Sequence, residues 1–93
     1  MENEKPIKVY VPVEVLFSED GRMRPHIIIW EDGRQYEINK ITEIRPAAAQ
    51  RAGGQGDRYT IWINGQQSYL FFERYATETG AKLGRWFVER RAS

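Results

Sequence analysis

The single histidine, His26, is the first residue to consider for catalysis. A histidine that acts as a general base needs a second group to orient it, and a metal site needs several ligands. The sequence has no HxH, HExxH, CxxC or DxD spacing, and its acidic pairs, Glu19–Asp20 and Glu31–Asp32, each precede a glycine, as in a solvated turn. We therefore expect His26 to be a half-exposed strand residue and the protein to be no enzyme, with no catalytic residue, no metal site and no cofactor.

A glycine-rich segment, Gly53–Gly56, is the next candidate, because glycine loops can cradle phosphate groups. Such loops work where a strand leads into the N-terminus of a helix. Here the segment leads into a predicted strand, and it lacks the Gly-Lys-Ser/Thr ending of a nucleotide-binding P-loop. A flexible loop is the favoured interpretation, and a loop that closes over a ligand or a partner is the alternative.

Arginine gives the clearest sign of a binding surface, since its guanidinium makes paired hydrogen bonds to phosphate or carboxylate and stacks on aromatic rings. Arg45, Arg51 and Arg58 bracket the glycine-rich segment, and Arg85 lies near the C-terminus. With exposed rings beside them, these arginines would hold single-stranded nucleic acid by base stacking and phosphate contacts. The opposing interpretation is that the arginines pair with glutamates, and the nearly balanced charge, +1 overall, favours it.

Aromatic residues occupy both faces of the last three predicted strands. Trp62 is out of phase with Ile61 and Ile63, and Trp86 alternates with Phe87. Successive side chains of a strand point to opposite faces, so only one of the two sets fills the core. The other set is covered by loops, buried in a dimer or exposed as a binding surface, and we expect cover by the chain's own loops. The candidate binding surface consists of Arg45, Arg51, Arg58, Trp62, Arg85 and Trp86.

Regular alternation predicts the first strands that must position these residues. Apolar side chains recur at every second position over Ile7–Phe17, which predicts a strand with one buried face. Pro12 lies within this run and lacks an N–H, so it marks an edge strand or a bulge. The next predicted strand is Met23–Trp30.

The strand that starts near Arg34 changes phase along its length. Ile41 and Ile44 are three residues apart instead of two, and a slip of one residue moves every side chain to the other face. We therefore expect a bulge or a sharp bend near Asn39–Lys40. The remaining predicted segments are a long connection over 46–57 with a helical turn at 47–52, strands over 58–63, 67–73 and 85–90, and a connector over 74–84 with a helical turn at 75–79.

Two dipeptides, Asp32–Gly33 and Asn64–Gly65, lie between predicted strands. Both suit the positive φ that a two-residue type I′ hairpin turn needs at each central residue. About six short strands with turns at regular spacing predict an all-β fold. Because 93 residues leave little room for two full sheets, we expect a small, bent antiparallel barrel, SH3-like or similar, with at most a short helical turn.

Length and composition fit one domain over residues 1–93, with frayed tails at 1–6 and 91–93. The sequence has no cysteine, so we expect no disulfide and no thiolate chemistry. No apolar run approaches the roughly 18 residues of a membrane span, and the polar N-terminus is unlike a signal peptide. We expect a cytoplasmic protein of bacterial type that does not contact a membrane.

Four strings of the sequence resemble a group of small uncharacterised bacterial proteins of Gram-positive type. These strings are Trp30–Ile38, Gly53–Tyr59, Leu70–Glu73 and Arg85–Glu89, and the resemblance extends over residues 25–90. It implies a cytoplasmic protein of unknown function and supplies no activity and no site residue.

The absence of catalytic residues and the two-faced aromatic strands together predict a non-enzymatic binding module. Its partner would be another protein or a second copy of the chain. The alternative is a nucleic-acid-binding barrel that uses the arginines and exposed aromatic rings.

Overall fold

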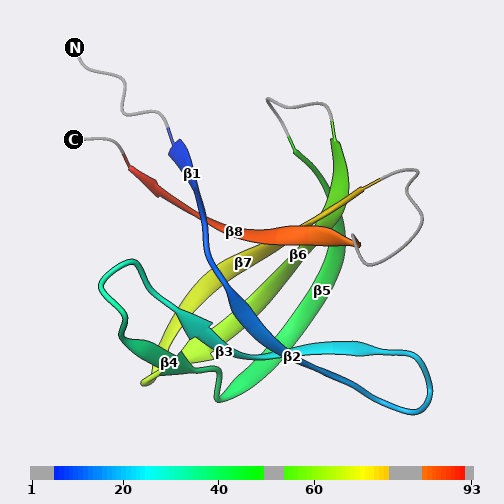
Figure 1. The fold of residues 1–93 in the computed structure, drawn as a ribbon, viewed down its shortest axis with the longest axis horizontal. Helices are drawn as coiled ribbons and strands as arrows, with labels where there is room; N and C mark the ends of the chain where they lie inside the picture. Colours follow the sequence, from blue (N-terminus) through cyan, green and yellow to red (C-terminus); the bar gives the residue numbers. More distant parts are fainter. Residues whose placement is uncertain (1–5, 50–53, 76–82, 92–93) are drawn as a thin grey trace.

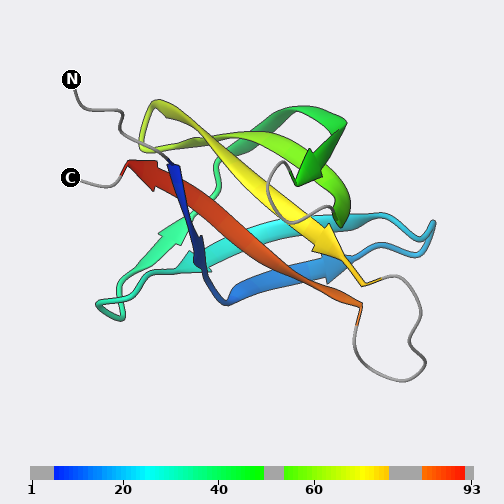
Figure 2. The ribbon, with the colours of Figure 1, turned by 90° about the horizontal axis from the view of Figure 1, so that it is seen from above.

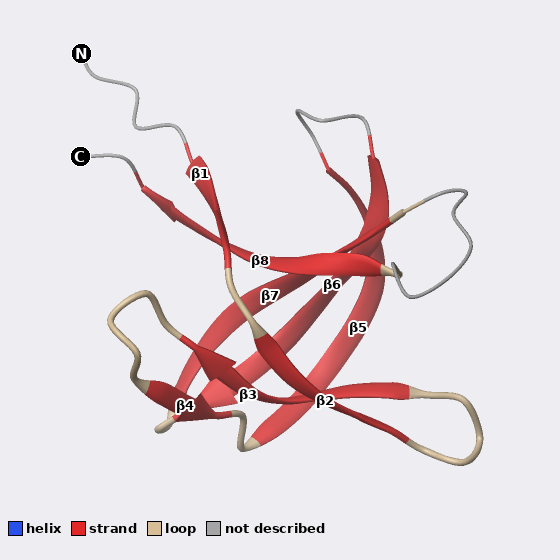
Figure 3. Cartoon of the chain, in the orientation of Figure 1, coloured by secondary structure: helices blue, strands red, loops and turns tan. Residues whose placement is uncertain are grey.

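Two antiparallel β-sheets make up the protein in the computed structural model, which describes residues 6–49, 54–75 and 83–91 (Figure 1). The larger sheet has the strand order β1-β8-β7-β6-β5, and the smaller has the order β2-β3-β4. No helix occurs among these residues (Figure 3), so the predicted all-β class is confirmed. The strands are β1 (Pro6–Tyr10), β2 (Val13–Phe17), β3 (Met23–Ile29), β4 (Gln35–Glu37), β5 (Lys40–Ala49), β6 (Gly54–Ile63), β7 (Gln66–Arg74) and β8 (Gly84–Arg91).

Strands β1 and β2 are consecutive parts of one bent segment that passes from the larger sheet to the smaller. At the bend, the Val11 N–H donates to the Trp86 carbonyl oxygen (3.1 Å), and the Ile29 N–H donates to the Pro12 carbonyl oxygen (3.0 Å). The single strand expected over Ile7–Phe17 is therefore two strands with different neighbours. Pro12 lies at the break, where its missing N–H leaves no ladder bond unmade.

Strands β4 and β5 form the second such bent segment. Between them, the Ile38 N–H donates to the His26 carbonyl oxygen (2.8 Å), and the Asn39 N–H donates to the Trp62 carbonyl oxygen (2.8 Å). The pairing of β5 with β6 then shifts register between Ile41 and Glu43. The sharp bend that was one of the two alternatives predicted near Asn39–Lys40 is confirmed, and the bulge lies slightly further along the chain.

Two bent segments join the two sheets, yet no closed barrel is found in the part of the chain that the structure describes. Strand β3 pairs with β4 only over Ile27–Ile29, and β5 is the last strand of the larger sheet. Pro25, which is fully buried in the first half of β3, has no N–H to donate to a further strand. The first half of β3 and the free edge of β5 therefore remain unpaired with each other.

The two ends of β3 carry the same turn (Figure 2), built from the repeated tetrapeptide Glu-Asp-Gly-Arg. In the first turn, the Gly21 N–H donates to the Ser18 carbonyl oxygen (2.9 Å), and the Ser18 N–H donates to that of Arg22 (2.9 Å). The corresponding bonds of the turn at 30–34 measure 2.9 and 2.8 Å. Gly21 and Gly33 both have a φ of 87°, the left-handed conformation that closes a three-residue hairpin loop.

The prediction of a two-residue type I′ turn is therefore wrong at Asp32–Gly33, and it is confirmed at Asn64–Gly65. Among the described non-glycine residues only Asn64 has a positive φ, 50°, and Gly65 follows with a φ of 79° between paired residues of β6 and β7. The Asp32 carboxylate instead accepts the N–H of Arg34 (3.0 Å), a side-chain bond that stabilises the longer loop.

The prediction of a long connection over 46–57 is wrong, because β5 and β6 extend into this segment and form a hairpin. Ala47 pairs with Gly56 across this hairpin. A β-carbon on Gly56 would collide with the backbone of Phe72, so this glycine permits close strand packing instead of loop flexibility. The helical turns expected at 47–52 and 75–79 lie partly outside the described residues, and the described parts are not helical.

The main core lies between the two sheets. Trp86 is its centre, with Phe72 at 4.8 Å and Tyr59 at 5.2 Å between ring centroids. Ile61 and Leu70 are the most deeply buried apolar residues beside these rings. The buried cluster comprises Val9, Val11, Ile28, Ile38, Tyr59, Ile61, Leu70, Phe72 and Trp86.

Candidate binding surfaces

The outer face of the larger sheet carries a second group of aromatic residues, separate from the core. Strand register aligns one residue from each of the five strands in a row across this face, which we call the outer row: Tyr10, Phe87, Phe71, Arg58 and Arg45. Phe87 follows the core residue Trp86 and so points to the opposite face. The prediction that both faces of these strands carry aromatics is confirmed.

The three rings of the outer row contact one another. Phe87 and Phe71 stack in parallel with ring centroids 4.9 Å apart, and Tyr10 meets Phe87 edge-to-face at 5.7 Å. Phe87 is only 3% exposed, whereas Tyr10 is 39% exposed. Two segments, 46–57 and 74–84, were expected to cover such a set. The described parts of 46–57 are strands of the same sheet and give no cover, and most of 74–84 lies outside the described residues.

Cationic side chains lie over the rings of this face. An aromatic face carries partial negative charge, so a cation above it is attracted. Four such contacts occur among the described residues, and all are on this face: Lys8 over Phe87 (4.7 Å), Lys40 over Trp62 (5.3 Å), Arg58 over Tyr69 (4.6 Å) and Arg85 over Tyr10 (3.7 Å).

Glu73 is the carboxylate at one end of the face. It accepts the hydroxyl of Tyr10 (2.8 Å) and lies 3.7 Å from the Arg85 Nε and 3.9 Å from the Lys8 Nζ. Burial, followed by this hydrogen bond and the negative charge of Glu73, raises the pKa of the Tyr10 phenol. One half-buried carboxylate thus holds three side chains from β1 and β8.

Glu43 plays the corresponding part at the other end. Arg45 and Arg58 are directly opposite in register, and like charges at such positions repel. Glu43 lies between them, with its Oε2 3.0 Å from the Arg45 Nη2 and its Oε1 3.6 Å from the Arg58 Nη2. The pairing of arginine with glutamate that the charge balance favoured is therefore present at Glu43 and Glu73.

Several buried polar atoms of this face have no hydrogen-bond partner in the described part of the protein. They are the Lys8 Nζ, the Arg58 Nε, the Thr60 Oγ1 and the Trp62 Nε1. Arg58, Thr60 and Trp62 occupy successive outward positions of β6. Unpartnered polar groups are uncommon in folded proteins, and here they concentrate on one strand.

Four of the six residues predicted for the binding surface lie together on the outer face: Arg45, Arg58, Trp62 and Arg85. Trp86 belongs to the core and offers no surface, and Arg51 lies outside the described residues. Sequence reasoning missed Lys8, Tyr10, Tyr69 and Glu73 as members of this face. The alternation of β1 places Lys8 and Tyr10 opposite Val9, but only the strand order reveals that β1 borders β8.

An apolar groove between the β2–β3 hairpin and β5 is the second candidate surface. It has a volume of about 430 Å³, and its apolar lining consists of Leu16, Met23, Ile41 and Ile44. Leu16 is 61% exposed and Ile44 is 54% exposed, and the neighbouring Phe17 is 57% exposed. The groove lies where the first half of β3 and the edge of β5 are left unpaired.

Charges of both signs border this groove: Asp20 and Arg22 of the first Glu-Asp-Gly-Arg turn, and Arg24 of β3. Asp20 and Arg22 lie 3.5 Å apart and are both largely exposed. The Ser18 hydroxyl and the Arg22 N–H bond to the Asp20 carboxylate, and these bonds lower its pKa. The groove was not predicted, because Leu16 falls on the face of its strand that alternation marks as polar.

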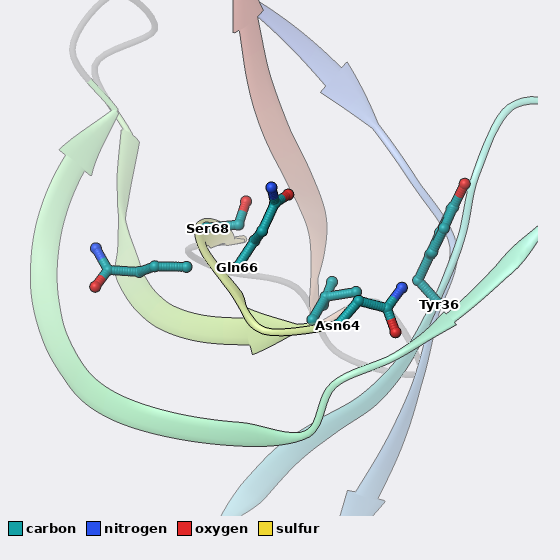
Figure 4. Close-up of a pocket in the computed structure, with 6 residues that line it drawn as sticks. Tyr36, Asn64, Gln66 and Ser68 are labelled. Carbon is teal, nitrogen blue, oxygen red and sulfur yellow. The ribbon is translucent and has the colours of Figure 1, made fainter.

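A smaller polar pocket of about 290 Å³ adjoins the β6–β7 turn. Figure 4 shows Asn64, Gln66 and Ser68 on the hairpin, with Tyr36 facing them from β4. Its lining contains amides and hydroxyls but no carboxylate, histidine or cation. The pocket offers hydrogen bonds but no acid–base pair.

His26 lines neither of these pockets. Its Nε2 lies 3.4 Å from the Glu37 Oε2, and both side chains are more than half exposed. No group of three or more potential metal ligands occurs in the described chain, and no helix there is long and apolar enough to cross a membrane. No family model, curated protein or solved structure matches the chain.

Proposed function

We propose that this protein is a non-enzymatic interaction module that binds other protein chains, including a second copy of itself, through the apolar groove. The observation that carries this proposal is the exposure of Leu16 and Ile44, which are each more than half accessible and line the same groove. Large apolar side chains exposed together are typical of an interaction site.

A second copy of the chain suits the groove for two reasons. The β2–β3 hairpin carries Leu16 and Phe17 beyond the core, so it supplies side chains of the kind that the groove of another copy would hold. The rim has both Asp20 and Arg24, and a two-fold axis placed between these two positions would set each of them against the opposite charge of the partner. The surface is therefore self-complementary in both polarity and charge.

The exposed His26–Glu37 pair supports a non-enzymatic role, because neither group is desolvated or held in a cleft. A small bent barrel is the architecture that we propose for the whole chain, supported by the two bent segments, β1–β2 and β4–β5, that pass from one sheet to the other. A bacterial, cytoplasmic origin and kinship with small uncharacterised Gram-positive-type proteins are also proposals, supported only by the sequence strings above.

Light scattering after size-exclusion chromatography tests the proposal. We expect the wild-type protein to show a dimer mass that falls towards the monomer on dilution. Leu16→Asp places a charge in the groove and should give a monomer at every concentration tested. Leu83→Asp is the matched control, because Leu83 is 56% exposed but lies outside the groove, and it should remain dimeric. A wild-type protein that is monomeric at every concentration tested would contradict the self-association that the proposal includes.

A further inference from the structure

The outer row divides into a ring half and an arginine half. Tyr10, Phe87 and Phe71 come from β1, β8 and β7, and Arg58 and Arg45 follow on β6 and β5. With neighbouring strands about 4.8 Å apart, the row is about 19 Å long. Aromatic rings thus occupy one half of a track on one side of the protein, and guanidinium groups occupy the other half.

The arginine half has more donors than acceptors. Glu43 is the one carboxylate within ion-pair distance of both Arg45 and Arg58 among the described residues. The Arg58 Nε is buried without a hydrogen-bond partner, and the Arg45 side chain is 57% exposed. A phosphate group between the two guanidiniums would supply further acceptor oxygens and relieve the repulsion of these opposed charges.

Two rings of this face are accessible to a planar ligand. Tyr10 is 39% exposed beneath the Arg85 guanidinium, and Tyr69 is 42% exposed beneath that of Arg58. A charge-assisted hydrogen bond to phosphate is stronger than a solvent-exposed contact between a cation and a ring. A phosphate would therefore draw the guanidinium aside, and the uncovered ring would stack with a base.

Hydrogen-bonding groups suited to a base edge lie between these features. Thr60 is 6% exposed, and its hydroxyl has no partner in the described chain; it lies opposite Tyr69 in register. The Trp62 indole N–H, at the next outward position of β6, also lacks an acceptor. Both atoms are buried, so carbonyl and ring-nitrogen acceptors of an unpaired base would satisfy them only after the side chains above them move aside.

We propose that the outer face of the larger sheet binds single-stranded nucleic acid. Arg45 and Arg58 hold phosphate groups, and Tyr10 and Tyr69 stack with bases. Charge favours this ligand over a protein partner, because five cations face three carboxylates among the described side chains: Lys8, Lys40, Arg45, Arg58 and Arg85 against Glu43, Glu73 and Glu89. A single strand is required, because rings on a sheet reach only bases that are not paired in a duplex.

Fluorescence anisotropy of a labelled oligothymidylate of about 15 nucleotides, matched to the site sizes of small β-domains, tests this proposal. We expect binding that weakens between about 50 and 200 mM salt, and Arg45→Gln should lower the slope of log affinity against log salt by about 0.7. Arg34→Gln, which removes a more exposed charge (75% against 57% for Arg45) from the β3–β4 turn of the smaller sheet, is the control and should leave the slope unchanged.

Two further variants distinguish base stacking on Tyr69, and competition by the ion pairs of Glu43, from simple attraction between charges. Tyr69→Ala should weaken binding about tenfold with an unchanged salt slope, because it removes a ring and no charge. Glu43→Gln should strengthen binding, since it frees both arginines, whereas Glu37→Gln on the smaller sheet should have less effect. Circular dichroism confirms that each variant is folded.

Three results would overturn the proposal. The first is no binding of the oligonucleotide at low salt, which would leave a protein as the partner for this face. The second is equal weakening by Arg45→Gln and Arg34→Gln, which would indicate attraction to overall charge. The third is full competition by inorganic polyphosphate together with unchanged binding by Tyr69→Ala, which would indicate a general anion surface. None of these results depends on whether the protein dimerises through the groove.

Discussion

Close contact between backbones decides where single glycines are required in this protein. Gly56 lies in β6 against the carbonyl group of Phe72 in β7, and a β-carbon there has no space. Gly56→Ala would push the two strands apart, so we expect the free energy of unfolding to fall by about 2 kcal/mol. Urea denaturation followed by tryptophan fluorescence measures this loss.

Ala47→Gly is a suitable control for that substitution, because Ala47 is the register partner of Gly56 on the edge strand β5. It increases the flexibility of the unfolded chain but creates no collision, so we expect a loss of about 0.5–1 kcal/mol. Equal losses for the two variants would show that the contact with Phe72 does not constrain residue 56.

Charged side chains of the outer face show how one residue can serve both structure and binding. Glu43 and Glu73 hold cations from neighbouring strands, which fits the stabilising role that charge balance predicts. Exposed ion pairs contribute little to stability, so the pairs of the more exposed Glu43 yield readily to a stronger anionic ligand. An arginine that forms an ion pair with a glutamate in the free protein can therefore also bind a ligand on this face.

At the scale of secondary-structure elements, the two hairpin turns differ in backbone conformation although their dipeptides are similar. A glycine substitution at the first residue of each dipeptide should therefore affect stability differently. Asn64 has a φ of 50°, so Asn64→Gly relieves an unfavourable conformation and should leave stability unchanged or slightly higher. Asp32 itself has no positive φ in its three-residue loop, and its carboxylate accepts the Arg34 N–H. We therefore expect Asp32→Gly to destabilise the protein by about 1 kcal/mol.

Thermal unfolding of the two variants beside the wild type checks this contrast. A gain in melting temperature for Asp32→Gly would mean that both turns share the two-residue form. The same experiment on Gly21→Ala and Gly33→Ala should give equal losses, because both glycines have a φ of 87° and open space around them.

Alternation of apolar residues predicts most strands correctly, but it does not reveal where strands change partners. The segment over Ile7–Phe17 alternates throughout, yet it is divided between two sheets at Pro12. The glycines and alanines of 46–57 predicted a loop, whereas Gly56 is a glycine because β6 packs closely on the backbone of Phe72. The division at Pro12 and the packing at Gly56 both depend on long-range register, which is not encoded in any local window of sequence.

The candidate surface was predictable by residue type and only partly by position. Arginine with aromatic residues indicated binding, and Arg45, Arg58, Trp62 and Arg85 do lie on one face. Alternation shows that Trp86 and Phe87 point in opposite directions, but it does not say which of them faces the core. The exposed groove escaped prediction because it forms between elements that are distant in sequence.

The two sheets behave as one unit at the scale of the whole molecule, since they share a core and are joined at two bends. Residues from both sheets enter that core: Ile28 comes from the smaller sheet, and Tyr59, Leu70 and Trp86 come from the larger. Neither sheet buries its apolar face alone. Unfolding should therefore be a single cooperative transition in which both sheets are lost together.

Alkaline pH offers a way to test this shared core through Tyr59. Burial, followed by the negative charge of Asp57, raises the pKa of its phenol, and Arg74 opposes the shift. The unfolded chain loses this proton near the ordinary value of about 10, whereas the folded protein retains it to higher pH. Between the two pKa values the unfolded chain binds fewer protons, so stability is complete below about pH 10 and falls as pH rises through the folded pKa.

Tyr59→Phe removes the titrating group from the core and keeps the ring that packs on Trp86. We expect the wild-type protein to lose more stability than this variant between pH 8 and pH 11, in urea titrations at each pH, by an amount that grows above about pH 10. A difference between the two proteins that stays constant with pH would show that the phenol ionises as freely in the folded protein as in the unfolded chain. That result would mean that the sheets separate enough to hydrate their common core while both remain folded.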